Sequence, residues 1–193
     1  MAVFRAVGDV HGKMNQYLDI IQGCDQSIQV GDFGAGFVDL PEIDTVHRQL
    51  RGNHDAPSVM KTYPNWIPDG HSENGMFFVG GARSEDQHLR REGVSWWADE
   101  ELSMSEFYDA LDKYEQAKPD FLFTHDCPEY ITHILLGYVN IRPSRTQQFL
   151  ESMRHIHKPK IHVFGHWHKS FDEVIDGTRY ICLAELEYID LDI

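Results

Sequence analysis

The chain of 193 residues is long enough for one sizeable hydrophobic core and does not require two, and 41% of its residues are hydrophobic. Its formal net charge of −14 argues against a surface that grips the phosphates of long nucleic acids, because such surfaces carry basic patches. No stretch approaches the roughly 20 apolar residues of a membrane span, and the N-terminus, MAVFRAVGDVHG, lacks the pattern of a signal peptide. We therefore expect a single cytoplasmic domain over residues 1–193 that binds no membrane.

Short apolar runs that end in polar residues, most of them after a glycine, recur along the whole chain. In chain order they are AVFRAV before Gly8-Asp9, SIQV before Gly31-Asp32, VHRQL before Arg51-Gly52-Asn53-His54-Asp55, FLF before Thr124-His125, and IHVF before Gly165-His166. Each of these runs is typical of a strand that ends in a loop.

Segments with helical spacing lie between these strands. They are Lys13 to Ile21, Ser103 to Lys118, and Ser144 to Ile156. Near the C-terminus, two further apolar runs flank an Asp176-Gly177 turn, which predicts a β-hairpin. The alternation of strands and helices indicates an α/β domain with mixed sheets, and in such domains ligands bind where the carboxyl ends of the strands meet.

The polar residues at the strand ends form a set of metal-ligand types. It comprises two carboxylates, one amide and four imidazoles, namely Asp9, Asp32, Asn53, His11, His125, His166 and His168. This mixture suits Mn, Fe, Ni or Zn better than Ca. Seven ligands are too many for one tetrahedral ion but suit two ions with a shared carboxylate, which could clamp a phosphoryl group and activate a water molecule. Taken alone, Asp9 and His11 could be turn residues, Asp32 a turn former, and His125 a partly buried structural histidine.

Five motifs carry a resemblance to a known family. They resemble, in the same order, the motifs of the calcineurin-like metallophosphoesterase superfamily: GDVHG, VGDFG, RGNHD, FTHDCP and FGHWH. Together they span Gly8 to His168. The resemblance implies a four-layer αββα sandwich, the metallo-dependent phosphatase-like fold, with two divalent metal ions, Mn before Fe, Ni, Zn or Co. It also implies a first ion held by Asp9, His11 and His168, a second held by Asn53, His125 and His166, and Asp32 as the bridge.

His54 resembles the catalytic histidine of that superfamily. A group whose pKa lies near neutrality could protonate the leaving oxygen or stabilise charge there. The serine/threonine phosphatases have an aspartate that orients this histidine, whereas this sequence has Ala35 in its place, which disfavours that subgroup. The stretch GGARSEDQHLRREGVSWW instead resembles one found in some small bacterial and phage members. Asp55 could orient His54, or it could simply cap the loop.

Substrate choice is expected to come from a long insertion, about residues 56–101, which contains GGARSEDQHLRREGVSWW. Arg83, Arg90 and Arg91 could bind a phosphate oxygen through the guanidinium group, and Arg83, after two glycines, is the preferred candidate. Trp96 and Trp97 could stack on a nucleobase or close a core beneath the loop.

The leading function is therefore a phosphatase or phosphodiesterase that acts on a small phosphate ester, with nucleotide-derived esters among the candidates. A nuclease is the first alternative, although the acidic charge speaks against long DNA or RNA as a partner. A non-catalytic protein-binding scaffold of the same fold is the second, and it is disfavoured because His54 is present. The sequence leaves the oligomeric state open.

Overall fold

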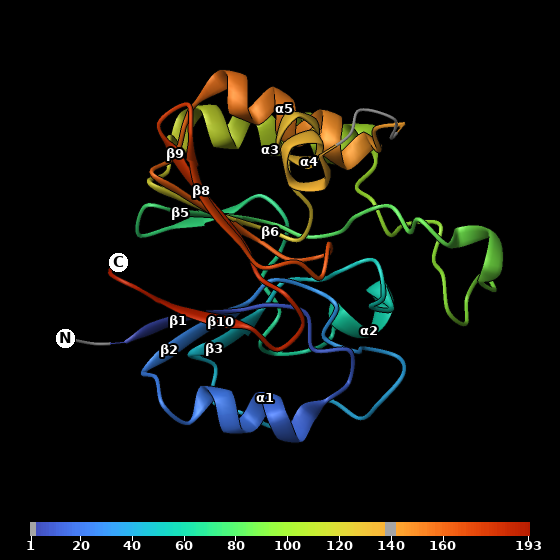
Figure 1. Ribbon diagram of the computed structural model, residues 1–193. Helices are drawn as coiled ribbons and strands as arrows, with labels where there is room; N and C mark the ends of the chain where they lie inside the picture. Colours follow the sequence, from blue (N-terminus) through green and yellow to red (C-terminus); the bar gives the residue numbers. More distant parts are fainter. Residues whose placement is uncertain (1–2, 138–141) are drawn as a thin grey trace.

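Two β-sheets lie face to face, and helices cover the outer face of each (Figure 1). The computed structural model describes residues 3–137 and 142–193. Helix α1 (Met14–Ile21) covers one sheet, while α3 (Met104–Ala117), α4 (Glu129–Leu136) and α5 (Arg145–Ile156) cover the other. The expected four-layer αββα sandwich with mixed sheets is confirmed.

The first sheet has the strand order β10-β1-β2-β3. Its strands are β1 (Phe4–Val7), β2 (Gln26–Gln29), β3 (His47–Gln49) and β10 (Tyr188–Leu191). The first three are parallel, and β10 pairs with β1 in the antiparallel direction. The carboxyl ends of β1, β2 and β3 therefore lie at one edge of the sheet.

The second sheet has the order β4-β5-β6-β7-β9-β8. Its strands are β4 (His71–Glu73), β5 (Met76–Val79), β6 (Phe121–Thr124), β7 (Ile161–Phe164), β8 (Phe171–Ile175) and β9 (Thr178–Cys182). The central four are parallel, whereas β4 and β8 form antiparallel edges. The expected hairpin around Asp176-Gly177 is confirmed as β8 and β9.

The main core lies between the two sheets. Alternate residues of a strand point to opposite faces, so one side of each strand can be buried against the other sheet. Ile28 and Leu50, on and just after strands of the first sheet, belong to one buried cluster with Phe78, Phe123 and Val163 of the second. This packing fixes the two sheets relative to each other and brings their strand ends together.

The three expected helices are found within one residue of their predicted ends at each terminus. Both α3 and α5 begin with a capping box, in which Ser103 or Ser144 exchanges hydrogen bonds with the residue three positions later. Helix α4 was not predicted, and it begins after Pro128 without a side-chain cap. No helix among the described residues is both long and apolar enough to cross a membrane.

The segment 56–101 differs from the expected insertion. It contains the short helix α2 (Pro57–Met60), and its β4 and β5 belong to the second sheet, where Phe77 and Phe78 are buried. Residues 83–101 lie outside the sheet, and their helical element among the described residues is a 3-10 turn at Gln87–Leu89. The segment thus contributes two strands to the second sheet in addition to its irregular parts.

Candidate metal centre

The predicted ligands come together at the carboxyl ends of the parallel strands of both sheets. Asp9 and His11 follow β1, Asp32 follows β2, and Asn53 follows β3, while the second sheet contributes the three remaining histidines after β6 and β7, His125, His166 and His168. Asp9, Asp32, Asn53 and His125 are at most 1% exposed, whereas His168 is exposed. The site therefore has a buried floor and an open side.

Four of these residues form a tight group. Asp9, His11, Asp32 and His168 each offer one ligand atom, and these atoms all lie within 4.8 Å of one another. The Nε2 of His168 lies 3.0 Å from Asp9 Oδ2 and 2.9 Å from His11 Nε2. Asp9 Oδ2 is buried and makes no hydrogen bond within residues 3–137 and 142–193. Ring nitrogens and a carboxylate oxygen that face one point suit a divalent metal ion.

A second group lies on the other side of Asp32. His125 Nε2 is 3.0 Å from Asn53 Oδ1 and 3.3 Å from Asp32 Oδ1, and the ring of His166 stands edge-on to that of His125, with 5.1 Å between centroids. His125 Nδ1 donates to the carbonyl of Val30 at 2.8 Å, which leaves the Nε2 lone pair free for a ligand bond.

The backbone at the site adopts conformations that few residues tolerate. Four predicted ligands have positive φ angles: His11 (48°), Asp32 (58°), His166 (65°) and His168 (49°). For non-glycine residues this region costs free energy, and such residues cluster at functional sites. A methyl group on Gly165 would overlap Asp9 Oδ1, as one on Gly52 would overlap Asp32 Oδ1. Glycine at these two positions therefore allows the carboxylates of Asp9 and Asp32 to approach the backbone closely.

The electrostatics of the site favour positive charge. Burial raises the pKa of Asp32, but His125 and the neighbouring imidazoles outweigh burial and hold that pKa well below its usual value. Burial lowers the pKa of His125, yet the carboxylate of Asp32 raises it to about 10. The carboxylate of Asp32 thus stays ionised, and its negative charge favours a protonated imidazole or a metal ion beside it.

His54 lies beside this centre on its open side. Its backbone N–H donates to Asp32 Oδ1 at 2.7 Å, and its Nε2 is 3.3 Å from Nη2 of Arg90. Its Nδ1 is buried and has no hydrogen-bond partner in the part of the chain that the structure describes. Burial lowers the pKa of His54, and Arg90 lowers it further, against the effect of Asp32. His54 is therefore held by its backbone and not by an orienting carboxylate.

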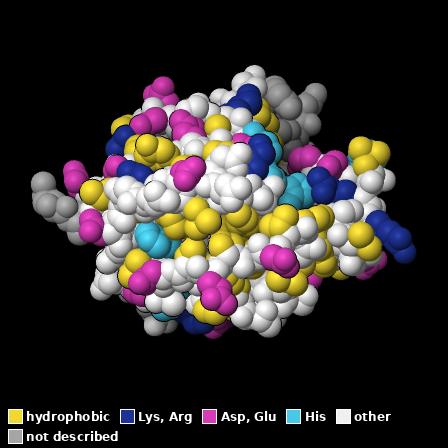
Figure 2. Space-filling view, turned by 90° about the horizontal axis from the view of Figure 1, so that it is seen from below, with side chains coloured by type: hydrophobic (Ala, Val, Ile, Leu, Met, Phe, Trp, Pro, Cys, Tyr) yellow, Lys and Arg dark blue, Asp and Glu magenta, His cyan; other side chains and the backbone are white. Residues whose placement is uncertain are grey.

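An open pocket of about 480 Å³ adjoins the metal-ligand group. It is lined by His11, Gly34, Phe37, His54, Arg90 and His168. Figure 2 shows histidine side chains gathered at the surface beside Lys or Arg and hydrophobic side chains, the combination that lines this pocket. A small molecule that enters this pocket would meet both the ligand group and His54.

Asp55 caps a loop and does not orient His54, and Arg83 contacts other protein groups outside the pocket. The buried carboxylate of Asp55 accepts hydrogen bonds from four backbone N–H groups, those of Phe33, Gly34, Ala35 and Gly52. These bonds are those of the loop-capping alternative, and none of them reaches His54. The guanidinium of Arg83 donates to Glu85 and to the carbonyl of Arg142, whereas Arg90 is the arginine that lies in the pocket.

Sequence reasoning missed two residues that hold Asn53. Asn53 Nδ2 donates to Ser84 Oγ at 3.1 Å, and Ser84 Oγ donates to Glu100 Oε2 at 2.6 Å. All three residues are at most 4% exposed. The amide is therefore fixed with its nitrogen toward Ser84 and its oxygen toward His125. No local pattern in the sequence signals this contact, because Ser84 and Glu100 lie 16 residues apart in an irregular segment.

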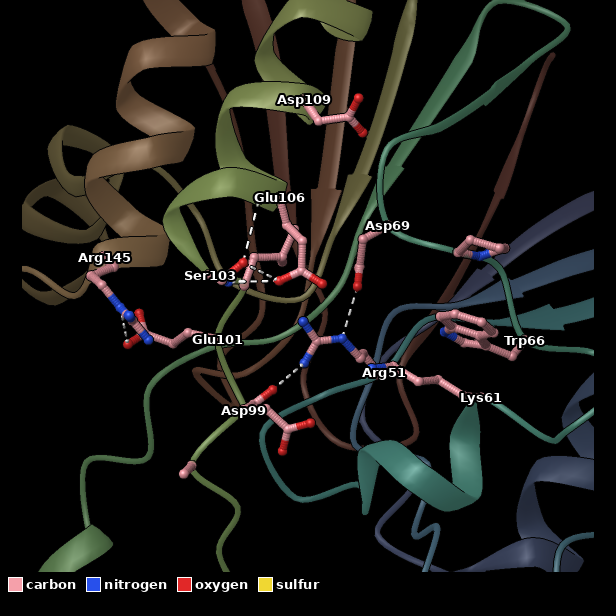
Figure 3. A pocket seen from close by; sticks show the side chains of 13 residues that line it. Arg51, Lys61, Trp66, Asp69, Asp99, Glu101, Ser103, Glu106, Asp109 and Arg145 are labelled. Carbon is pink, nitrogen blue, oxygen red and sulfur yellow. Dashed lines mark hydrogen bonds and ion pairs between the residues drawn. The ribbon is translucent and has the colours of Figure 1, made fainter.

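Arg51 anchors the loop that carries Asn53 through hydrogen bonds to residues 69 and 99–100. Figure 3 shows the polar pocket around Arg51, whose Nε donates to Asp69 and whose Nη1 donates to the backbone carbonyls of Asp99 and Glu100. Glu101 and Arg145, drawn in the same pocket, form an ion pair at 3.3 Å. These pairs make the pocket a structural link between the Asn53 loop and residues 99–101.

Comparison with solved structures shows similarity of fold at low sequence identity. A Staphylococcus aureus protein proposed to be a 5'-nucleotidase, solved with alpha-ketoglutarate, aligns with a TM-score of 0.55 and 13% identity over 98% of this chain and 50% of that chain. GAP50, the anchor in the inner membrane complex of Plasmodium, aligns with a TM-score of 0.46 and 8% identity over 95% and 72%, too weakly to support an inference. No family model and no curated protein matches the sequence. The chain spans about half the length of the Staphylococcus aureus protein and shares its fold over that part.

Proposed function

We propose that this protein is a phosphoric ester hydrolase that uses two divalent metal ions, with Mn as the first candidate and Fe, Ni, Zn or Co as the others. One ion would be held by Asp9, His11 and His168, the other by Asn53, His125 and His166, and both by Asp32. The position of Asp32 carries the proposal. Its Oδ1 lies 3.3 Å from His125 Nε2 and its Oδ2 lies 3.9 Å from His11 Nε2, so one buried carboxylate faces both groups.

The residues around the ions have separate roles in this proposal. Bound metal ions would polarise the phosphoryl group and lower the pKa of a water molecule. His54 lies in the adjoining pocket, where its ring can give a proton to the leaving oxygen from Nε2. Asp55 positions the loops of Asp32 and Asn53 through its backbone hydrogen bonds and does not touch the substrate. Arg83 uses Nη2 for Glu85 and Arg142, and it could bind phosphate through Nε or Nη1 if its side chain turned toward the pocket.

The substrate that fits best is a small phosphate ester, and residues 1–193 would act as one catalytic domain. The structural neighbour proposed to be a 5'-nucleotidase supports this choice, although only its fold is shared. A nuclease has less support, because the chain carries a net charge of −14 and the pocket is lined by a single arginine within the described residues. A scaffold role has less support because His54 lies in the pocket.

The proposal is tested with protein that has been reconstituted with Mn, Ni, Co or Zn and assayed on 4-nitrophenyl phosphate and bis(4-nitrophenyl) phosphate. Asp32→Asn is expected to lose metal and turnover together, whereas His54→Ala keeps the metal and loses turnover by about 100-fold or more. His155→Ala, an exposed histidine on α5, is the control. Turnover of neither ester with any of these metals, or unchanged metal content in Asp32→Asn, contradicts the proposal.

A further inference from the structure

Arg90 is held in the pocket by its own segment. Its Nε donates to Asp86 Oδ1 at 2.5 Å, and its Nη1 donates to the carbonyl of Ser95 at 3.2 Å. Two of its three nitrogens are therefore fixed by residues 86–95. The third, Nη2, faces His54 Nε2 at 3.3 Å. The guanidinium thus presents one end to the pocket in a defined position.

That end matches an oxygen of a phosphate group. A guanidinium remains charged at every relevant pH and forms short, charge-assisted hydrogen bonds to phosphate oxygens. Nη2 carries two N–H groups, so it can bond a phosphate oxygen in the space that His54 also borders. One of these N–H groups faces His54 and the other can serve the phosphate oxygen.

Phe37 gives the pocket an aromatic surface. Its side chain lines the pocket with His11 and is 49% exposed, although large aromatic side chains gain free energy from burial. Trp97 stands edge-on to it, with 5.6 Å between ring centroids and an interplanar angle of 81°. Because Trp97 supports Phe37 at one edge, a flat group can pack against the exposed part of the Phe37 ring.

We propose that the pocket selects a phosphomonoester with a planar leaving group, in which Arg90 binds a non-bridging phosphate oxygen and Phe37 contacts the ring of the leaving group. This inference rests on the proposed function and names its substrate class. A monoester has one more unesterified oxygen, and at neutral pH about one more negative charge, than a diester. Arg90 lines the pocket, and its positive charge attracts the phosphoryl group of a monoester more strongly than that of a diester because the monoester carries more negative charge.

The test compares Arg90→Ala with Arg91→Ala, which removes the same charge from the exposed neighbouring position. The affinity of the Mn-loaded protein for inorganic phosphate, measured by calorimetry, is expected to fall about 10- to 100-fold in Arg90→Ala, because a hydrogen bond to a charged group is lost. The metal content should stay unchanged. KM for 4-nitrophenyl phosphate rises by a similar factor and KM for bis(4-nitrophenyl) phosphate rises much less. Arg91→Ala behaves as the wild type.

Phe37→Ala tests the contact with the leaving group. It is expected to raise KM for 4-nitrophenyl phosphate about fivefold to tenfold and to leave KM for glycerol phosphate, which has no ring, unchanged. Equal effects on both substrates overturn the ring contact. Suppose that the wild type hydrolyses esters and that Arg90→Ala and Arg91→Ala bind phosphate equally and have equal KM values for both esters. The role of Arg90 is then wrong, while the proposed function stands. A wild type that hydrolyses neither ester overturns the inference and the proposed function together.

Discussion

Replacing Ser84 by Ala is expected to weaken the binding of one metal ion without unfolding the chain. Ser84 Oγ is the single atom that joins the amide of Asn53 to the carboxylate of Glu100. Without it, Asn53 Nδ2 loses its acceptor, and Glu100 keeps only the backbone N–H of residue 84. The amide can then rotate, and its oxygen no longer faces His125 in one fixed position.

The size of the effect follows from the bonds that are lost. A buried polar group without a partner costs about 1–3 kcal/mol, and a hydrogen bond to a charged group contributes about 1.5–3 kcal/mol. Part of this loss lowers the free energy of unfolding, and the part borne by Asn53 lowers metal affinity. Loss of partners behind a metal ligand typically costs about 10- to 100-fold in affinity, or about 1.4–2.7 kcal/mol, which agrees with the first estimate.

The assay is a calorimetric Mn titration of chelator-treated protein, with the bound ions counted by elemental analysis. Ser84→Ala is expected to bind one ion as the wild type does and the other about 10- to 100-fold more weakly. Ser95→Ala removes a hydroxyl from the same segment that contacts only the backbone N–H of Arg91, and it serves as the control. Two ions bound with wild-type affinity by folded Ser84→Ala would refute the role assigned to this contact.

Three further predictions concern stability. Chelation of the metal ions leaves Asp9 and Asp32 buried without a cation and should lower Tm by about 5–15 °C in calorimetry; an unchanged Tm argues against tight binding. Gly165→Ala should lower the free energy of unfolding in urea by about 1–3 kcal/mol and reduce metal content, because the new methyl group overlaps Asp9. Gly23→Ala is the control: its methyl group meets only the end of an arginine side chain, so both quantities should stay unchanged. Burial lowers the pKa of His162 from 6.5 to about 3. Between these two pH values the unfolded chain binds a proton that the folded chain does not. The free energy of unfolding therefore decreases as the pH falls from 6.5 to about 3. In metal-free protein the loss from this histidine between pH 7 and pH 5 is about 2 kcal/mol, and His162→Gln should remove it; an equal slope in both proteins contradicts this assignment.

The parts of the site that follow strand ends could be predicted from the sequence. Asp9, Asp32 and His125 each come directly or almost directly after a buried apolar run, and parallel strands bring such positions to one edge whatever the loops do. The helices were predicted from the spacing of their apolar residues, and the capping boxes of Ser103 and Ser144 lie at the starts of two of them. These signals are local, or they depend only on the direction of the strands.

The contacts of residues 83–101 could not be predicted in the same way. Arg83 follows two glycines and looked better placed than Arg90, but irregular backbone turns Arg83 toward Glu85 and Arg142 and turns Arg90 toward His54. The roles of Ser84 and Glu100 depend on contacts that span 16 and 31 residues without periodicity. Strand β5 was missed although Met76–Val79 is a short apolar run, because Gly80-Gly81 and no metal-ligand type follows it, and β4 was missed because it contains no apolar residue.

The placement of the ligands on two different sheets has a consequence for folding kinetics. Asp32 follows a strand of the first sheet and His125 follows a strand of the second, while His11 and His168 meet across 157 residues of chain. Contacts of such long sequence separation form late, since loop closure must precede them. In the proposed assignment neither sheet alone contains a complete set of ligands, so tight metal binding would begin only once the sheets have docked. Metal uptake during refolding would therefore time the docking step, and a bound ion would slow the separation of the two halves.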